Sequence, residues 1–165
     1  MFKQAMCAAA LASMPMSAAH ASEPHQPAPE WGEHVDTLSR IIVLEADGRA
    51  HDWAAILWVL EHRRARSRSG DPEGAWRYCA ATNHAGTPRA RRILDAPLDE
   101  LPRARRAQVE RAQSFVTAWI DGRIADPCAG ATHWAGTGDA WPSHLRVVSC
   151  GPTLNIFGRE RAGDS

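Results

Sequence analysis

Apolar residues follow helical spacing in three long segments, and this pattern constrains the fold more than any other feature of the chain. From Val35 the apolar positions Leu38, Ile41 and Ile42 repeat every three or four residues, and Gly48 follows as a helix stop. Beyond residue 122, glycines and prolines interrupt the chain repeatedly and leave only short apolar runs. The pattern predicts a small α+β domain that is mainly helical, with a short antiparallel β element near the C-terminus.

The remaining elements follow from caps and breakers. The second helix is expected to begin at Asp52, a good N-cap, and to end among arginines near residue 66, where positive charge suits the helix dipole. The third is expected over residues 102–121, because proline is tolerated in a first turn and a glycine follows its end. Residues 67–100 read mostly as loop with one short helix at 89–94. The strand candidates are 145–150 and 154–157.

Residues 1–21 have the organisation of a signal peptide. Lys3 precedes an uncharged run, residues 5–19, which is rich in Ala, Met and Leu and too short to span a membrane. Ala19 and Ala21 supply the small residues that a signal peptidase requires. A buried N-terminal helix is the alternative interpretation.

The rest of the chain divides into three parts. Residues 22–33 contain three prolines and little apolar content, which predicts a flexible tether. The folded domain is expected over residues 34–160, and residues 161–165 are expected to form a disordered tail. The mature protein is expected in the periplasm or outside the cell, as a monomer with no stable membrane insertion after signal cleavage.

Export changes how the cysteines are interpreted, because disulfides persist mainly outside the cytosol. Removal of the signal peptide leaves Cys79, Cys128 and Cys150, so one of the three is left over. We favour a Cys128–Cys150 disulfide, which closes a loop of about twenty residues and stabilises the fold by roughly 3 kcal/mol on the chain-entropy model. A zinc site is the competing interpretation, but the usual paired ligand motifs are absent. We expect neither a metal nor another cofactor.

The charge balance argues against nucleic-acid binding. Nineteen acidic residues balance nineteen basic ones, and binding through phosphate neutralisation needs a field of one sign. The arginine-rich stretch at residues 89–111 also holds four acidic residues, so we interpret it as a solvated helix face.

Glu45 does not fit its position. It lies three and four residues after Ile42 and Ile41 and seven after Leu38, so its carboxylate shares the apolar face of the first helix. It also lies in the last turn, where free carbonyl groups disfavour a negative charge. Both effects favour the protonated form, which a general acid for glycosidic cleavage needs. The alternative is that Glu45 pairs with an arginine at the edge of the core.

A second group of candidate residues follows the third helix, over residues 126–134 and at Trp141. Small residues there would let a ligand approach the backbone, and Trp134 and Trp141 offer indole faces on which sugar rings can stack. Thr132 and His133 could orient a substrate or a water molecule. The alternative is that the two indoles cover a small core.

Three segments resemble the catalytic domain of the SleB-type, or spore-cortex-lytic, cell wall hydrolases, in the family's order. They are LSRIIVLEADG at 38–48 running into WAAILWVLEHR at 53–63, then WIDGRIADPCAGATHW at 119–134, and LNIF at 154–157. The first resembles the family's "EA-x-GE" segment and the helix after it, which typically ends in Asn-Arg. The second resembles "G-x-x-x-DPT-x-GA-T-x-F", and the third resembles the end of the closing "G-x-H-x-F-Y" motif.

The resemblance implies a small lysozyme-like α+β domain that cleaves the glycan strands of peptidoglycan. It implies that Glu45 is the catalytic acid and that Asn155, near the place of the closing His, belongs to the substrate site. Cleavage between N-acetylmuramic acid and N-acetylglucosamine by one carboxylate is the reaction of a lytic transglycosylase. A muramidase-type hydrolase would need a second carboxylate, for which Asp47 and Asp52 are the nearest candidates. A non-catalytic domain that binds peptidoglycan or another exported protein is the third hypothesis.

Overall fold

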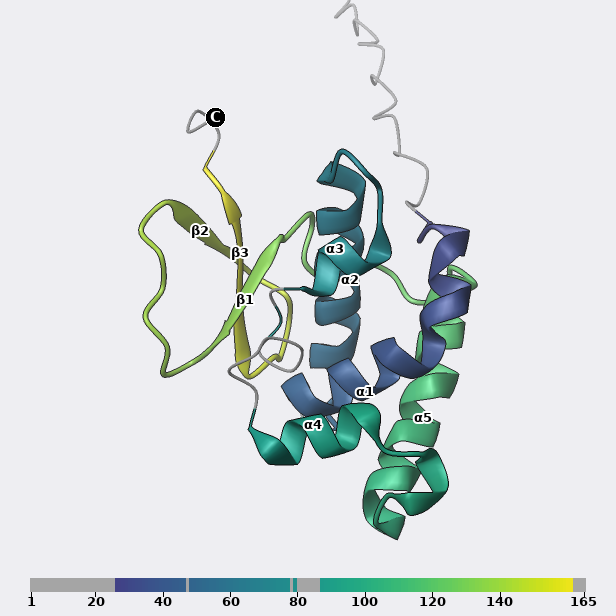
Figure 1. The fold of residues 1–165 in the computed structure, drawn as a ribbon. Helices are drawn as coiled ribbons and strands as arrows, with labels where there is room; N and C mark the ends of the chain where they lie inside the picture. Colours follow the sequence, from purple (N-terminus) through teal and green to yellow (C-terminus); the bar gives the residue numbers. More distant parts are fainter. Residues whose placement is uncertain (1–25, 47, 78, 80–86, 162–165) are drawn as a thin grey trace, which may run out of the picture.

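The structure is a computed structural model that describes residues 26–46, 48–77, 79 and 87–161 (Figure 1). Its elements are η1 (Pro29–His34), α1 (Val35–Ala46), α2 (Ala50–Arg66), α3 (Pro72–Trp76), α4 (Pro88–Asp95), η2 (Leu98–Glu100), α5 (Arg103–Ile120), β1 (His133–Gly136), β2 (Leu145–Val148) and β3 (Asn155–Glu160). The prediction of a mainly helical α+β domain with a β element near the C-terminus is confirmed. The expected signal peptide, the first residues of the tether and residues 162–165 lie outside the described residues.

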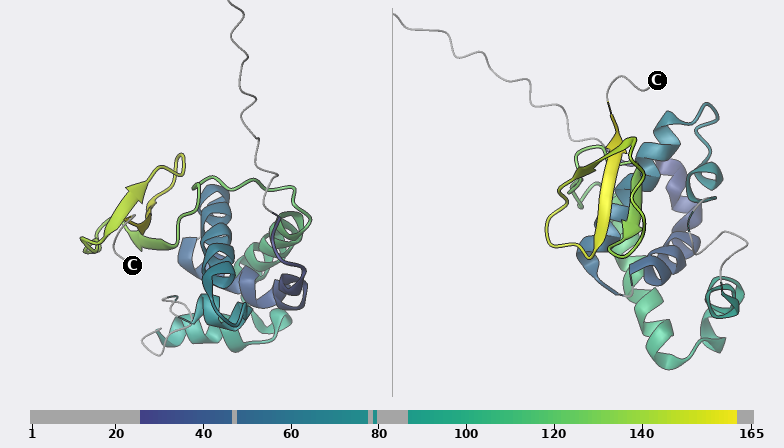
Figure 2. Two further views of the ribbon diagram at one scale, coloured as in Figure 1. Left: turned by 90° about the horizontal axis from the view of Figure 1, so that it is seen from above. Right: turned by 90° about the vertical axis from the view of Figure 1, so that its left-hand side faces the viewer.

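The helices form one layer and the sheet lies beside it, with α2 between the two (Figures 1 and 2). Helix α1 packs against α2, α4 and α5, and α2 contacts β1. Almost every residue of α2 between 52 and 61 is buried, as expected for a helix that is covered on all sides. The largest fully buried side chains are those of Trp31, Trp58, Trp119, Phe157, Leu38, Ile41, Ile42, Ile56, Leu57, Leu60, Glu61 and Val43.

The prediction of a flexible tether is wrong for its last residues, because residues 29–33 belong to the folded domain. They form most of η1, whose Trp31 is fully buried. Its indole lies against Trp76 and Trp119, with ring centroids 5.9 and 5.7 Å apart, and its Nε1 donates to Glu61 Oε2 at 2.7 Å. The high proline content predicts a tether, but a single buried indole is enough to anchor the segment to the domain.

The predicted N-cap at Asp52 is also wrong, since α2 begins at Ala50 and Asp52 lies buried in its first turn. The Asp52 carboxylate is turned toward the sheet, where it accepts from the backbone N–H groups of Leu154 and Asn155 at 3.2 and 3.4 Å. Arg49 Nε donates to its other oxygen at 2.6 Å. Asp52 therefore ties the start of α2 to the start of β3.

The other helices agree closely with the predictions, with α1, α4 and α5 found over the expected segments. Helix α3 was not predicted, because its five residues lie between breakers and carry no periodic pattern. Asp71 caps it by accepting from the backbone N–H of Glu73 at 3.0 Å. Among the described residues, no helix has the length and apolar character needed to cross a membrane.

The sheet has three antiparallel strands in the order β1–β3–β2, one more than predicted. Strand β1 lies in the segment interpreted as a ligand loop, and its Trp134 is the register partner of Phe157. The predicted disulfide is confirmed: Cys128, which precedes β1, is bonded to Cys150, which follows β2. This bond joins the segment that leads into β1 to the segment that leaves β2.

Candidate functional site

Glu45 lies in the last turn of α1, half-buried, where the helical layer meets the sheet. The indole Nε1 of Trp134 on β1 donates to Glu45 Oε2 at 3.3 Å. The neighbouring Ile41 and Ile42 are fully buried, so Glu45 lies at the edge of the apolar face on which the spacing placed it. The carboxylate therefore faces the sheet, where the Trp134 indole is one of its partners.

Arg63 of α2 joins Glu45 and Trp134 in one cluster. Its guanidinium lies 4.6 Å from the centroid of the Trp134 ring, and its Nε donates to the Thr132 carbonyl at 2.7 Å. Burial lowers the pKa of Arg63, while the nearby Cys79 thiol and Glu45 carboxylate act in the opposite direction. Arg63 therefore covers one face of the indole, and that face is not open to a sugar ring.

Cys79 is the fourth member of the cluster and lies just beyond α3. Burial and, to a lesser extent, the Glu45 carboxylate raise the pKa of its thiol to about 12, although Arg63 acts in the opposite direction. The thiol is therefore protonated at neutral pH and is not a nucleophile there. Sequence reasoning missed Arg63 and Cys79 as site residues, although Arg63 coincides with the arginine that ends the family's helix motif.

The turn before β1 is fixed by polar contacts to α2. Asp126 accepts from the backbone N–H groups of Cys128 and Gly130 at 2.8 and 3.1 Å, which closes the turn. His62 contacts Asp126 through Nε2 at 3.4 Å, and its Nδ1 lies 2.8 Å from the Ala131 carbonyl oxygen. Because that oxygen can only accept, Nδ1 carries a proton. These contacts set where β1, and therefore Trp134, begins.

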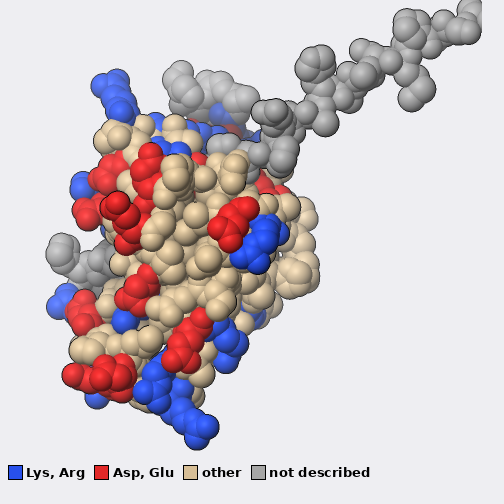
Figure 3. Space-filling view, turned by 90° about the vertical axis from the view of Figure 1, so that its right-hand side faces the viewer, with Lys and Arg blue, Asp and Glu red and all other residues tan. Residues whose placement is uncertain are grey.

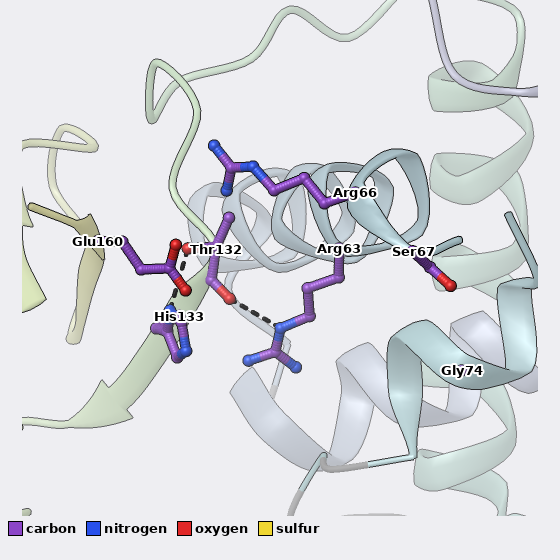
Figure 4. A pocket seen from close by; sticks show the side chains of 7 residues that line it. All are labelled: Arg63, Arg66, Ser67, Gly74, Thr132, His133 and Glu160. Atoms are coloured by element: carbon purple, nitrogen blue, oxygen red, sulfur yellow. Dashed lines mark hydrogen bonds between the residues drawn. The ribbon is translucent and has the colours of Figure 1, made fainter. Parts of the chain in front are cut away.

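Thr132 and His133 line a hollow of about 520 Å³ between the end of α2 and the sheet. The other residues around it are Arg63, Arg66, Ser67, Gly74 and Glu160 (Figure 4). Thr132 Oγ1 and His133 Nδ1 are 3.0 Å apart, and Thr132 is buried. Burial lowers the pKa of His133, and the positive charges of Arg63 and Arg66 lower it further, so the imidazole is neutral at pH 7.

The two other predicted substrate residues, Trp141 and Asn155, lie on opposite faces of the sheet. The Trp141 ring lies over Gly158, on the opposite face of β3 from Phe157 and Trp134, where it covers the outer side of the sheet. Asn155 lies at the start of β3, with its backbone N–H bonded to Asp52 and its carbonyl accepting from Thr153 Oγ1 at 3.0 Å. The structure therefore brings together Glu45, Thr132, His133 and Trp134 through Arg63. Asn155 shares the face of β3 that carries Phe157 opposite Trp134, whereas Trp141 covers the other face.

Comparisons of the chain with family models, with curated proteins and with solved structures found no match. In the part of the chain that the structure describes, no three His, Cys, Asp or Glu side chains are placed to hold a metal ion. Functional inference therefore depends on the cluster around Glu45 and on the hollow beside it.

Proposed function

We propose that the protein cleaves peptidoglycan glycan strands between N-acetylmuramic acid and N-acetylglucosamine, as a lytic transglycosylase in which Glu45 is the acid and the base. The observation that carries the proposal is the position of Glu45, half-buried at the junction of helices and sheet and held by the indole N–H of Trp134. A disulfide between Cys128 and Cys150 is compatible with action in the periplasm or outside the cell.

The reaction needs one carboxyl group. Protonated Glu45 would give its proton to the glycosidic oxygen as the bond to the muramyl anomeric carbon breaks. The carboxylate would then accept the proton of the muramyl 6-hydroxyl, whose oxygen bonds to that carbon and closes a 1,6-anhydro ring. Glu45 ends the cycle protonated, so no water is consumed and no other proton donor is needed.

The environment of Asp52 favours this reaction over hydrolysis. A muramidase-type hydrolase usually needs a second carboxylate as nucleophile or base. The Asp52 carboxylate is 1 % exposed and is held by Arg49 and two backbone N–H groups. Asp47, the other candidate, lies outside the described residues. The hydrolase remains the second hypothesis.

A peptidoglycan-binding domain without activity is the third hypothesis, but Arg63 argues against binding by open stacking on Trp134. The guanidinium over the indole leaves polar contacts, rather than an open aromatic face, on that side of the ring. Binding alone would not require a carboxyl group next to Trp134, where Glu45 lies. Substitution of Glu45 therefore separates a catalytic role from a binding role.

The experiment is digestion of purified sacculi by the protein and its Glu45→Gln variant, with products identified by mass spectrometry. We expect fragments with 1,6-anhydromuramyl ends, and a loss of at least about a hundredfold in rate for Glu45→Gln, because it removes the general acid. Glu110→Gln is the matched control, since Glu110 is exposed on α5. Reducing muramic acid ends would favour the hydrolase. Binding without soluble products, unchanged in Glu45→Gln, would contradict both enzymatic hypotheses.

A further inference from the structure

Four arginines surround a second hollow, of about 570 Å³, at the end of the sheet. They are Arg66 from the end of α2, Arg146 from β2, Arg159 from β3, and Arg161 just beyond β3, with Glu160 as the one carboxylate in the lining. This arginine hollow adjoins the one described above, because Arg66 and Glu160 line both. Four guanidinium groups against one carboxylate make it a positive site in a chain whose formal net charge is zero.

The strand register places two of these arginines directly opposite each other. Arg146 of β2 is the register partner of Arg159 of β3, so both side chains leave the sheet on the same face. Like charges at such a position destabilise a sheet. Among the described residues, none of the ion pairs involves Arg66, Arg146, Arg159 or Arg161. An anion between the strands would remove the repulsion.

The other side of the molecule has a different distribution of charge. On the face shown in Figure 3, acidic and basic side chains are interspersed. Around the arginine hollow, guanidinium groups come from three separate elements, and Arg66 extends from α2 toward the sheet (Figure 4). The charge on Arg66 also reaches His133, whose pKa it helps to lower after burial and Arg63. The fold thus collects positive charge at one place.

The chemistry of this site favours discrete carboxylates. A planar guanidinium binds a carboxylate through two parallel hydrogen bonds. A densely charged polyanion would need a wider positive field than this neutral chain offers. Arg63 and Thr132 line the adjoining hollow, and Arg63 contacts Trp134, the hydrogen-bond partner of Glu45. A ligand that extends from Glu45 along Arg63 would therefore reach the arginine hollow.

We propose that the arginine hollow binds the free carboxylates of the peptide stems carried by the glycan strand, and so makes the enzyme prefer strands that bear stems. This inference rests on the proposed function, because only a strand cleaved at Glu45 would present its stems here. Arg146 and Arg159 would bind one carboxylate between them, and Arg66 and Arg161 would bind another.

The first test measures binding, which does not depend on catalysis. The probe is a soluble tetrapeptide stem with free carboxyl groups, titrated by calorimetry beside the same peptide with its carboxyl groups amidated. We expect amidation to weaken binding at least about tenfold, and the double variant Arg146→Gln/Arg159→Gln to lose a similar factor for the free peptide, because charge-assisted hydrogen bonds are lost. Arg111→Gln, an exposed arginine of α5, is the control and should bind as the unaltered protein does.

The second test compares rates on intact strands and on strands whose stems an amidase has removed. The unaltered protein should prefer intact strands, and the ratio of the two kcat/KM values should fall about tenfold in the double variant. Equal binding of free and amidated peptides would overturn the inference, as would tighter binding of a glycerol phosphate polymer. Peptide binding without cleavage of either substrate would overturn the proposed function instead.

Discussion

Trp31 gives the strongest test of how the domain is held together, because it lies in the segment whose composition predicts a tether. The side chain is fully buried, and a tryptophan buries up to about 250 Å². At about 25 cal/mol per Å² of apolar surface, this corresponds to an upper limit of about 6 kcal/mol. Tryptophan-to-alanine changes in cores usually cost about 3–5 kcal/mol. We therefore expect Trp31→Ala to lower the free energy of unfolding by about 4 kcal/mol, a large part of a small domain's stability.

Trp31→Phe separates the hydrogen bond from the packing. Phenylalanine keeps a ring beside Trp76 and Trp119 but cannot donate to Glu61. Glu61 retains Arg64, whose Nε and Nη2 lie 2.8 and 2.9 Å from its carboxylate oxygens, so the expected loss is about 1–2 kcal/mol.

The assay is urea unfolding followed by far-ultraviolet circular dichroism, with Glu33→Gln, an exposed residue of η1, as the control. A loss below about 1 kcal/mol for Trp31→Ala would refute the reasoning, because residues 29–33 would then be a tether after all.

Two further predictions concern the sheet and Cys79. A Cβ at Gly158 would collide with the Trp141 ring and lie 2.9 Å from the Arg146 carbonyl oxygen, so Gly158→Ala should cost about 1–3 kcal/mol in urea unfolding. The double variant with Trp141→Leu should recover part of that loss, and no recovery would mean that the ring is not the obstacle. The Cys79 thiol has a pKa of about 12 in the fold against 9.0 in a free thiol, so above about pH 9 the unfolded chain holds fewer protons and stability falls as pH rises. The fall should approach about 1.4 kcal/mol per pH unit, and Cys79→Ala should reduce the slope of unfolding free energy against pH by that amount; equal slopes would contradict the buried thiol.

The sequence predicted most of the helices because their evidence is local. Apolar spacing located α1 and α5, and the breakers on either side located α4. The sequence-based prediction failed where a distant contact decides the conformation. The position of Trp31 is fixed by its hydrogen bond to Glu61, and the Asp52 carboxylate binds the backbone of residues 154 and 155 instead of capping a helix. Strand β1 was missed for the same reason, since its four residues are a strand only beside β3.

The candidate site residues also differ in whether a local sequence pattern reveals them. Glu45 was singled out because a carboxylate on an apolar face is visible in one helix, and its half-buried position agrees with that reasoning. Trp141 was proposed from residue type and order, and neither property shows that its ring lies over Gly158, on the opposite face of the sheet from Trp134. Arg63 was missed because an arginine at the end of a helix has an ordinary explanation there.

Helix α2 determines the geometry around Glu45 through polar side chains that reach three other segments. Asp52 fixes the start of β3, Glu61 binds η1, and His62 and Arg63 hold the carbonyl groups just before β1. Apolar packing alone allows neighbouring elements to shift while volume is conserved, whereas hydrogen bonds fix distance and direction. The 3.3 Å contact between Trp134 and Glu45 spans two elements that both pack on α2, so its length depends on these contacts. Because each is made by a buried or half-buried group, loss of any one would leave a desolvated partner as well as move β1.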